Sequence, residues 1–235
     1  MIGPITSYRT GRKIVRFPTL PEDRERVRVA AQSLWSLVPS TTREVSFSCP
    51  GRGGVLGAIR WAASLEHFVE FDVSNAYESV AFSRWPAQGT RHIRDVLSAF
   101  GLTLEDVTYG RRMALPRGFA TSGPLWEIYV ASIDRQIIQR RMYRRYADNV
   151  MFLGHPSFLH SAFGARGFSL RETRLRFCSG TTLLGAVIAR DHVGEPMSVR
   201  PSRRLRRELR GWVHRIEAAG DTAEDLWGDS AEFRG

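Results

Sequence analysis

The segment 144–154, RRYADNVMFLG, constrains the fold more than any other part of the chain. It places the polar pair Asp148 and Asn149 between two short, largely apolar stretches. Short apolar runs on either side of a polar turn are typical of paired β-strands, so the segment predicts a strand, a tight turn and a second strand. Neither polar side chain can contribute to a hydrophobic core at the tip of such a hairpin. An explanation for them comes from a second carboxylate far upstream.

That second carboxylate is Asp72, which ends the segment 67–73, HFVEFDV. The alternation in this segment predicts a strand that carries Phe68, Glu70 and Asp72 on one face. If this strand is an antiparallel neighbour of the hairpin, Asp72 and Asp148 converge at one edge of the sheet.

Two converging carboxylates form a candidate site for divalent metal ions. Hard cations such as Mg²⁺ prefer oxygen ligands, and two of them about 3.5–4 Å apart can activate a 3′-hydroxyl and stabilise a leaving pyrophosphate. From the spacing alone, however, two aspartates that merely solvate strand ends are the simpler interpretation.

The rest of the pattern predicts an α+β fold with segregated helices. Apolar residues that recur about every 3.6 positions predict helices at 20–38, 55–65, 91–102, 124–142 and 202–219. Further strands are predicted within 8–18 and over 181–191.

Composition sets limits on the class of protein. With 235 residues, 43% of them hydrophobic, the chain can bury a sizeable core as one domain with small lobes. It has no apolar run of about 18 residues and no hydrophobic signal core, so we expect no membrane association and a cytoplasmic, or if viral a virion-associated, location. Cys49 and Cys178 are too few for a disulfide framework or a cysteine zinc site, and we expect both to be buried small residues.

The charge balance points to a polyanionic partner. The formal net charge is +10 and the pI is about 10.6, although Lys13 is the only lysine. Such a charge on a chain of this size favours nucleic acid as the partner.

Four segments, in this order, resemble a known family: FVEFDVSNAYESV, LPRGFATSGPLWEIYVASID, YRRYADNVMFLG and TTLLGAVIARD. They are similar to motifs A, B, C and E in the palm of reverse transcriptases, and most of all to the bacterial group II intron and retron types. RKIVRFPTLPEDRERV and PGRGGVLGAI resemble the fingers segments that precede motif A. The resemblance covers roughly residues 10–200.

The resemblance implies a right-hand polymerase fold with an antiparallel palm sheet. Its expected parts are fingers at 1–65, a palm at 66–195 with a second fingers segment at 85–112, and a partial thumb at 196–235. The expected activity is RNA-directed DNA synthesis from dNTPs on an RNA template and primer, or on an RNA/DNA duplex.

The family pattern also implies roles for single residues. Asp72 and Asp148 become the carboxylates that bind Mg²⁺ or Mn²⁺, and the backbone carbonyl of Val73 is a further ligand. Tyr77 falls where the family has an aromatic gate beneath the incoming sugar, which would crowd a 2′-hydroxyl and favour deoxynucleotides. The alternative for Tyr77 is a tyrosine of the core.

Motif B carries three changes from the family, one of which is that Gly123 follows Ser122 and the family's proline comes one step later, as Pro124. Arg117 replaces a glutamine and Glu127 replaces an asparagine, so the template contacts are expected to differ in detail. Gly118 is kept, and it lets the backbone approach a template base or a nucleotide. The resemblance implies that Arg117 and Gly118 line the pocket for the template and the nucleotide.

Basic residues are expected around the triphosphate. Arg24 lies where the family places an arginine, and Lys13 and Arg16 are further candidates, because such groups bind phosphate oxygens. Arg174 stands where motif D usually offers a lysine; an arginine is a poor general acid but can neutralise pyrophosphate. Solvated surface charges are the alternative for the fingers residues.

Asn149 is the main departure, because the family normally has a second aspartate there. An asparagine keeps an oxygen ligand but removes one negative charge, so we expect activity to fall or to shift toward Mn²⁺. Two rival functions stay open: an RNA-dependent RNA polymerase of a virus or mobile element, and a catalytically weak palm that serves as a nucleic-acid-binding subunit.

The predicted helix 202–219 comes where the family's thumb begins, and its arginines could follow a duplex backbone. A solvated charged helix is the alternative. A short thumb should grip a duplex weakly, so we expect a second subunit, a structured RNA or a homo-oligomer to complete it, or low processivity.

Overall fold

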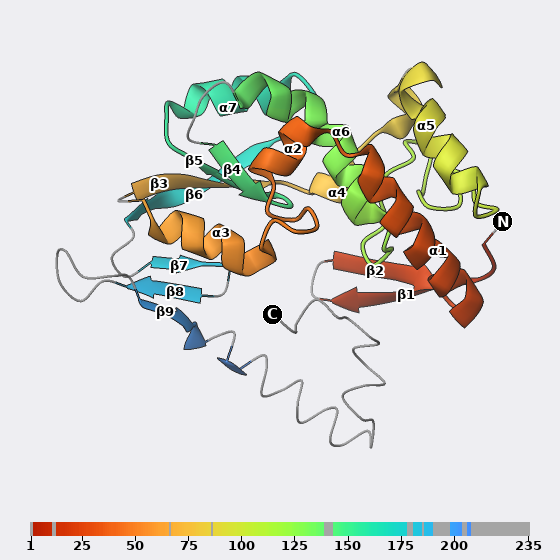
Figure 1. Cartoon of the computed structure of the whole chain (residues 1–235), viewed down its shortest axis with the longest axis horizontal. Coiled ribbons are helices and arrows are strands. Elements are labelled where there is room, and N and C mark those ends of the chain that lie inside the picture. Colours follow the sequence, from red (N-terminus) through yellow and green to blue (C-terminus); the bar gives the residue numbers. More distant parts are fainter. Residues whose placement is uncertain are drawn as a thin grey trace. The chain divides into compact units, whose positions relative to one another are not determined.

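The structure is a computed structural model that describes residues 2–10, 13–65, 67–85, 87–138, 143–177, 181–184, 186–189, 198–203 and 206–207 (Figure 1). It is a mixed α+β fold with antiparallel sheets, as the sequence predicted. The chain divides into two compact units, Met1–Arg176 and Phe177–Gly235. The two units are defined by their compactness alone, so they do not test the predicted division into fingers, palm and thumb, which stays a prediction.

The first unit is built on a sheet of four strands in the order β4-β5-β3-β6. Their bounds are Tyr143–Tyr146 for β4, Asn149–Phe152 for β5, His67–Val73 for β3 and Leu170–Phe177 for β6. The pairs β4–β5 and β3–β5 are antiparallel. The sequence therefore correctly predicted a strand, turn and strand around Asp148, and β3 is indeed a neighbour of that hairpin.

Register decides which side chains share a face of this sheet. Asp72 lies opposite Asn149, which in turn lies opposite Tyr146, so these three side chains share one face. The other face carries Phe71 and Tyr143, both of them fully buried.

Two helices cover the face that carries Phe71 and Tyr143 (Figure 1). Helix α6 spans Ser122–Ile137 and α7 spans Pro156–Gly164. The ring of His160 in α7 lies edge-on to Phe71, with centroids 5.7 Å apart. Most of α6 is buried, including the indole of Trp126, which explains why its apolar residues extend almost all the way round the helix.

A separate hairpin precedes the first long helix. Strands β1, Ile5–Thr10, and β2, Lys13–Pro18, pair antiparallel, and α1 follows at Pro21–Leu34. Pro21 at the first helical position needs no N–H partner, and acidic residues in the first turn favour the helix N-terminus. Helix α1 packs against α6 and against α5, Ala87–Ser98.

The remaining elements of the first unit are short. They are η1 at Trp35–Leu37, α2 at Ser40–Val45, α3 at Gly54–Ala63, α4 at Ala76–Ser79 and η2 at Phe82–Arg84. The predicted helices at 20–38, 55–65, 91–102 and 124–142 are thus all observed, with shifted ends. Helices α2, α4 and α7 and strand β6 were not predicted.

The second unit contains a three-stranded antiparallel sheet. Its strands are β7 at Thr181–Leu183, β8 at Ala186–Ala189 and β9 at Ser198–Pro201. Strands β7 and β8 agree with the strand pair predicted at 181–191. Of the predicted helix 202–219, only 202–203 and 206–207 belong to the described residues, so the thumb prediction lies outside them.

Two smaller expectations can be compared with the structure. Within the described part of the chain, no helix is long and apolar enough to cross a membrane. Cys49 is buried with a free thiol, as expected, and Cys178 lies outside the described residues.

Candidate active site

The structure brings Asp72 and Asp148 together at one edge of the central sheet. Asp72 is the next-to-last residue of β3, and Asp148 lies in the two-residue turn between β4 and β5. The register pairs Asp72 with Asn149, and the backbone N–H of Val73 donates a hydrogen bond of 3.0 Å to the carbonyl of Asp148. The strand end and the turn are therefore tied directly to one another.

The electrostatics of Asp148 report the closeness of the two carboxylates. Burial raises the pKa of Asp148, and the negative charge of Asp72 raises it further. A backbone hydrogen bond and the charges of Arg117 and Lys13 oppose this rise without cancelling it. A bound cation would offset the repulsion that Asp148 experiences from Asp72.

The oxygen donors at this edge fit a hard divalent cation. Two carboxylates, the amide oxygen of Asn149 and the carbonyl of Val73 are the ligand types that Mg²⁺ and Mn²⁺ accept. Among the residues that the structure describes, no three His, Cys, Asp or Glu side chains form a group that could hold a metal. Carbonyl, amide and substrate oxygens would therefore have to complete the coordination shell.

Two contacts modulate the carboxylate pair. The guanidinium of Arg171 lies 3.6 Å from Asp72, but with 71% of the arginine side chain exposed this ion pair is weak. The amide of Asn149 donates to a carboxylate oxygen of Asp148 over 3.4 Å, so Asn149 contacts this carboxylate directly.

A pocket of about 340 Å³ contains four of the residues that the sequence assigned to nucleotide binding. Lys13, Tyr77, Arg117 and Gly118 all line it. The rest of the lining that the structure shows is Val15, Phe119, Ser122 and Gly123. The charges of Lys13 and Arg117 act on the pKa of Asp148, which places this basic pocket next to the carboxylate pair.

Arg117, which lines the pocket, forms an ion pair with Glu78. Its Nε lies 2.7 Å and its terminal nitrogen 3.1 Å from the two carboxylate oxygens, the bidentate geometry of a strong ion pair. Burial would lower the pKa of Arg117, but the hydrogen bonds and charge of Glu78 raise it. Arg117 is therefore positively charged, and one anion already binds it.

Tyr77 forms the inner wall of the pocket. Its ring lies 5.8 Å from that of Trp126, and the guanidinium carbon of Arg117 is 5.4 Å from the ring centre. Burial, followed by the charges of Asp148 and Glu127, raises the pKa of Tyr77. The phenol is therefore neutral, and it presents an uncharged aromatic ring beside the carboxylates.

Gly118 brings the segment 116–118 against the β1–β2 hairpin. Its φ is +100°, in the region that favours glycine, and a Cβ there would overlap the carbonyl oxygen of Arg16 and lie 2.6 Å from Val15 Cγ1. A backbone hydrogen bond of 2.6 Å from Arg16 to the carbonyl of Arg117 joins the same two segments.

We expect Gly118→Ala to reduce the free energy of unfolding by about 1–3 kcal/mol, because both the positive φ and the close approach oppose a Cβ. Gly101→Ala is the matched control: Gly101 has a φ of +64° but no atom within 4 Å of an added Cβ. Urea unfolding curves of both variants provide the comparison, and an equal loss in the two would contradict the close approach.

Two of the predicted phosphate ligands lie elsewhere. The guanidinium of Arg24 donates to the carbonyls of Pro18 and Thr19, where it caps the end of β2. The guanidinium of Arg16 packs 4.1 Å from the ring centre of Tyr109. Neither Arg16 nor Arg24 lines the pocket. Lys13, the third of the predicted basic residues of this region, does. Arg174 belongs to β6, and its side chain is outside the described residues.

Beneath the turn lies a buried ionic network that sequence reasoning missed. All five N–H donors of Arg145 find acceptors: the carboxylates of Glu127 and Asp134, both on α6, and the carbonyl of Ala147. The hydroxyl of Tyr143 donates to Asp134 over 2.8 Å. Burial raises the pKa of Glu127, while the charge and hydrogen bonds of Arg145 oppose that rise.

The sequence did contain a signal for this network. Glu127 and Asp134 are seven residues apart, so they share a face of an otherwise apolar helix. Tyr143 and Arg145 are two residues apart in β4, so both lie on its buried face. Glu127 and Asp134 each bind this arginine through both carboxylate oxygens.

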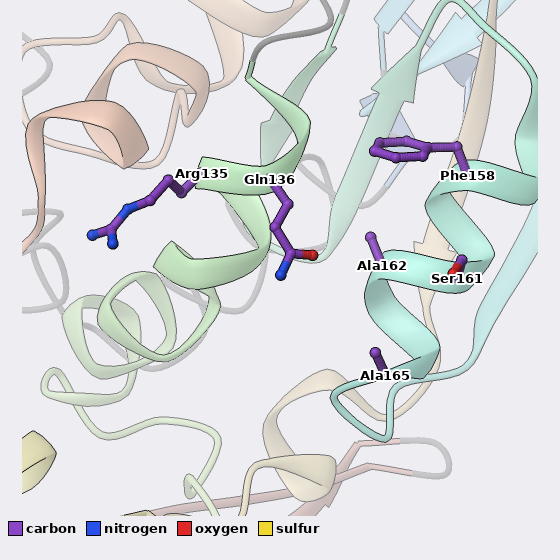
Figure 2. A pocket seen from close by; sticks show the side chains of 6 residues that line it. All are labelled: Arg135, Gln136, Phe158, Ser161, Ala162 and Ala165. Atoms are coloured by element: carbon purple, nitrogen blue, oxygen red, sulfur yellow. The ribbon is translucent and has the colours of Figure 1, made fainter.

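A larger cavity, of about 560 Å³, lies between α6 and α7 and away from the carboxylates. Figure 2 shows Arg135 and Gln136 of α6 on one side, with Phe158, Ser161, Ala162 and Ala165 of α7 opposite. Among the described residues that line it there is no carboxylate, and the one charged side chain, Arg135, points away from α7 (Figure 2), so this cavity lacks the chemistry of the smaller pocket.

Comparisons with known proteins do not add to this picture. No protein-family model matches the sequence, and no curated protein matches it.

Proposed function

We propose that the protein is a template-dependent nucleic-acid polymerase, and specifically an RNA-directed DNA polymerase. The observation that carries the proposal is the meeting of Asp72 and Asp148 at a sheet edge, beside a basic and aromatic pocket. The motif resemblance supports it independently, since it assigned both carboxylates and four residues of the pocket to one reaction. The net charge of +10 suits a nucleic-acid substrate.

Each residue has a defined part in the proposed reaction. Asp72 and Asp148, with the carbonyl of Val73, would hold Mg²⁺ or Mn²⁺. The bound cations would lower the pKa of a primer 3′-hydroxyl and stabilise the negative charge of the leaving pyrophosphate. Lys13 and Arg117 bind phosphate oxygens, because both are cationic and both face the pocket.

The proposed fold follows from the same assignment. The four-stranded sheet with α6 and α7 behind it is the palm, and the β1–β2 hairpin, which Arg16 and Arg117 join to the pocket, belongs to the fingers. An RNA template and primer are the proposed partners. A second subunit, a structured RNA or another copy of the chain is proposed to complete the grip on the duplex.

Primer extension on an RNA template tests the function. With labelled dNTPs or NTPs, and with Mg²⁺ or Mn²⁺, we expect incorporation of dNTPs that is lost in Asp72→Ala. Preferential incorporation of NTPs would instead support the RNA polymerase alternative. RNA binding without incorporation of any nucleotide, in either metal, would support the binding subunit.

Tyr77 is the residue that we expect to select the sugar. Tyr77→Val removes the ring, so the efficiency with NTPs relative to dNTPs should rise roughly 10–100-fold, the size of effect that pocket shape can produce. Because the ratio is measured within one variant, a loss of folded protein cancels. Tyr8→Val, on the exposed face of β1, is the control and should leave the ratio unchanged. An unchanged ratio in Tyr77→Val would contradict the gate.

A further inference from the structure

The residue before Asp148 is fixed by side chains from three separate segments. The N–H of Ala147 donates to the hydroxyl oxygen of Ser48 over 2.5 Å. Its carbonyl accepts from the indole N–H of Trp126 at 3.2 Å and from Arg145 at 3.4 Å. Both backbone groups of one turn residue are therefore bound by side chains from outside the turn.

This anchoring holds a backbone conformation that the turn would not favour alone. Ala147 has a φ of +49°, in the left-handed region, which costs free energy for any residue with a Cβ. Such a conformation persists only where the surroundings determine it. The three hydrogen bonds to Ala147 provide that determination.

Ser48 is the contact furthest away in the sequence, 99 residues from Ala147. It belongs to the segment between α2 and α3, outside every segment that resembles a palm motif. The hydroxyl of Ser46 donates to its oxygen over 3.3 Å, and the N–H of Phe47 donates to the carbonyl of Arg145 over 2.9 Å. The segment 46–48 is thus docked along β4 and aims one hydroxyl at the turn.

We propose that Ser48 is a positioning residue for Asp148. By holding Ala147 in its left-handed conformation, Ser48 keeps the carboxylate of Asp148 next to that of Asp72, so that both can bind the same cations. This proposal rests on the proposed function, since it assumes that the two carboxylates bind metal. Groups that support a metal ligand in this way typically change metal affinity about 10- to 100-fold when they are removed.

The test is Mn²⁺ binding to the whole chain in the absence of nucleotide and nucleic acid. The electron paramagnetic resonance signal of free Mn²⁺ measures how much of the metal is bound. We expect Ser48→Ala to weaken binding about 10-fold. Ser48→Thr, which keeps the hydroxyl, should bind close to wild type. Ser98→Ala is the matched control, because the Ser98 hydroxyl bonds only its own helix, at the Asp95 carbonyl, on the exposed side of α5.

Primer extension supplies a second measurement, because a residue that only stabilised the fold would not change the Mn²⁺ dependence of the rate. Ser48→Ala should lower kcat and raise the Mn²⁺ concentration needed for half-maximal rate, while KM for the nucleotide stays near wild type. The reason is that Ser48 forms hydrogen bonds with Ser46 and Ala147, whereas Lys13 and Arg117 belong to other segments. Thermal unfolding of each variant sets the temperature at which all are folded.

The outcomes separate the two proposals. If Mn²⁺ binding by wild type is lost in the double variant Asp72→Ala with Asp148→Ala, but Ser48→Ala binds as tightly as wild type, the role of Ser48 is wrong and the metal site stands. If the double variant binds Mn²⁺ as well as wild type does, the metal site itself is wrong, and the role of Ser48 fails with it.

Discussion

Replacing Asp148 by asparagine is expected to reduce nucleotide incorporation by roughly 1,000-fold or more while making the folded protein more stable. The loss of activity follows because metal ions supply several kcal/mol of transition-state stabilisation, and each 1.36 kcal/mol is a factor of ten in rate. Primer extension under single-turnover conditions measures this loss.

The gain in stability follows from the raised pKa of Asp148. A carboxyl whose pKa is higher in the folded than in the unfolded state favours the fold while it is protonated. This contribution is lost as pH rises from the ordinary aspartate pKa of about 3.9 through the raised value. At neutral pH the ionised carboxylate therefore opposes folding, and the uncharged amide should not.

Urea unfolding at neutral pH checks the sign of this effect. Asp106→Asn is the control with the opposite expectation. Although burial would raise the pKa of Asp106, hydrogen bonds from Thr103 and Ile2 lower it, so its charge stabilises the fold. Full activity in Asp148→Asn would contradict the catalytic assignment. A loss of stability equal to that of Asp106→Asn would contradict the electrostatic account.

The second large effect is expected at Arg145. Arg145→Ala leaves the buried carboxylates of Glu127 and Asp134 without their partner, and breaking a buried ion pair in this way costs about 3–5 kcal/mol. For a chain of this size that corresponds to a fall of roughly 6–20 °C in the midpoint of thermal unfolding. Calorimetry or circular dichroism measures the midpoint.

Two further variants give this prediction its controls. Arg145→Lys keeps the charge but has only three donors for the five hydrogen bonds, so its midpoint should lie between those of wild type and Arg145→Ala. Arg28→Ala removes an exposed arginine that pairs with Glu25 within α1, and it should leave the midpoint unchanged. If Arg145→Ala and Arg28→Ala behaved alike, the network would not hold α6 against β4.

Local pattern was sufficient to predict the elements that carry the carboxylates. Alternation in 67–73 and the polar pair Asp148 and Asn149 depend only on neighbouring residues, so strand, turn and the face of Asp72 could be predicted. The turn itself is shifted by one residue, because Asn149 is already the first residue of β5. The gathering of Lys13, Tyr77 and Arg117 came from the resemblance, because composition and periodicity do not say which distant segments meet.

Interactions that depend on tertiary packing could not be predicted in the same way. Whether Arg24 is free to bind phosphate depends on the carbonyls at the end of β2, which accept its hydrogen bonds in the structure. The pairing of Glu78 with Arg117 spans 39 residues, and that of Ser48 with Ala147 spans 99. Nothing local in the sequence marks either pair.

The most direct measurement of the central claim is X-ray diffraction from crystals soaked in Mn²⁺, with data collected for its anomalous scattering. We predict anomalous peaks between the carboxylates of Asp72 and Asp148. If two ions bind, their two peaks should lie about 3.5–4 Å apart. Carboxylates turned apart at saturating Mn²⁺, with no peak between them, would contradict the claim that these two residues share metal ions.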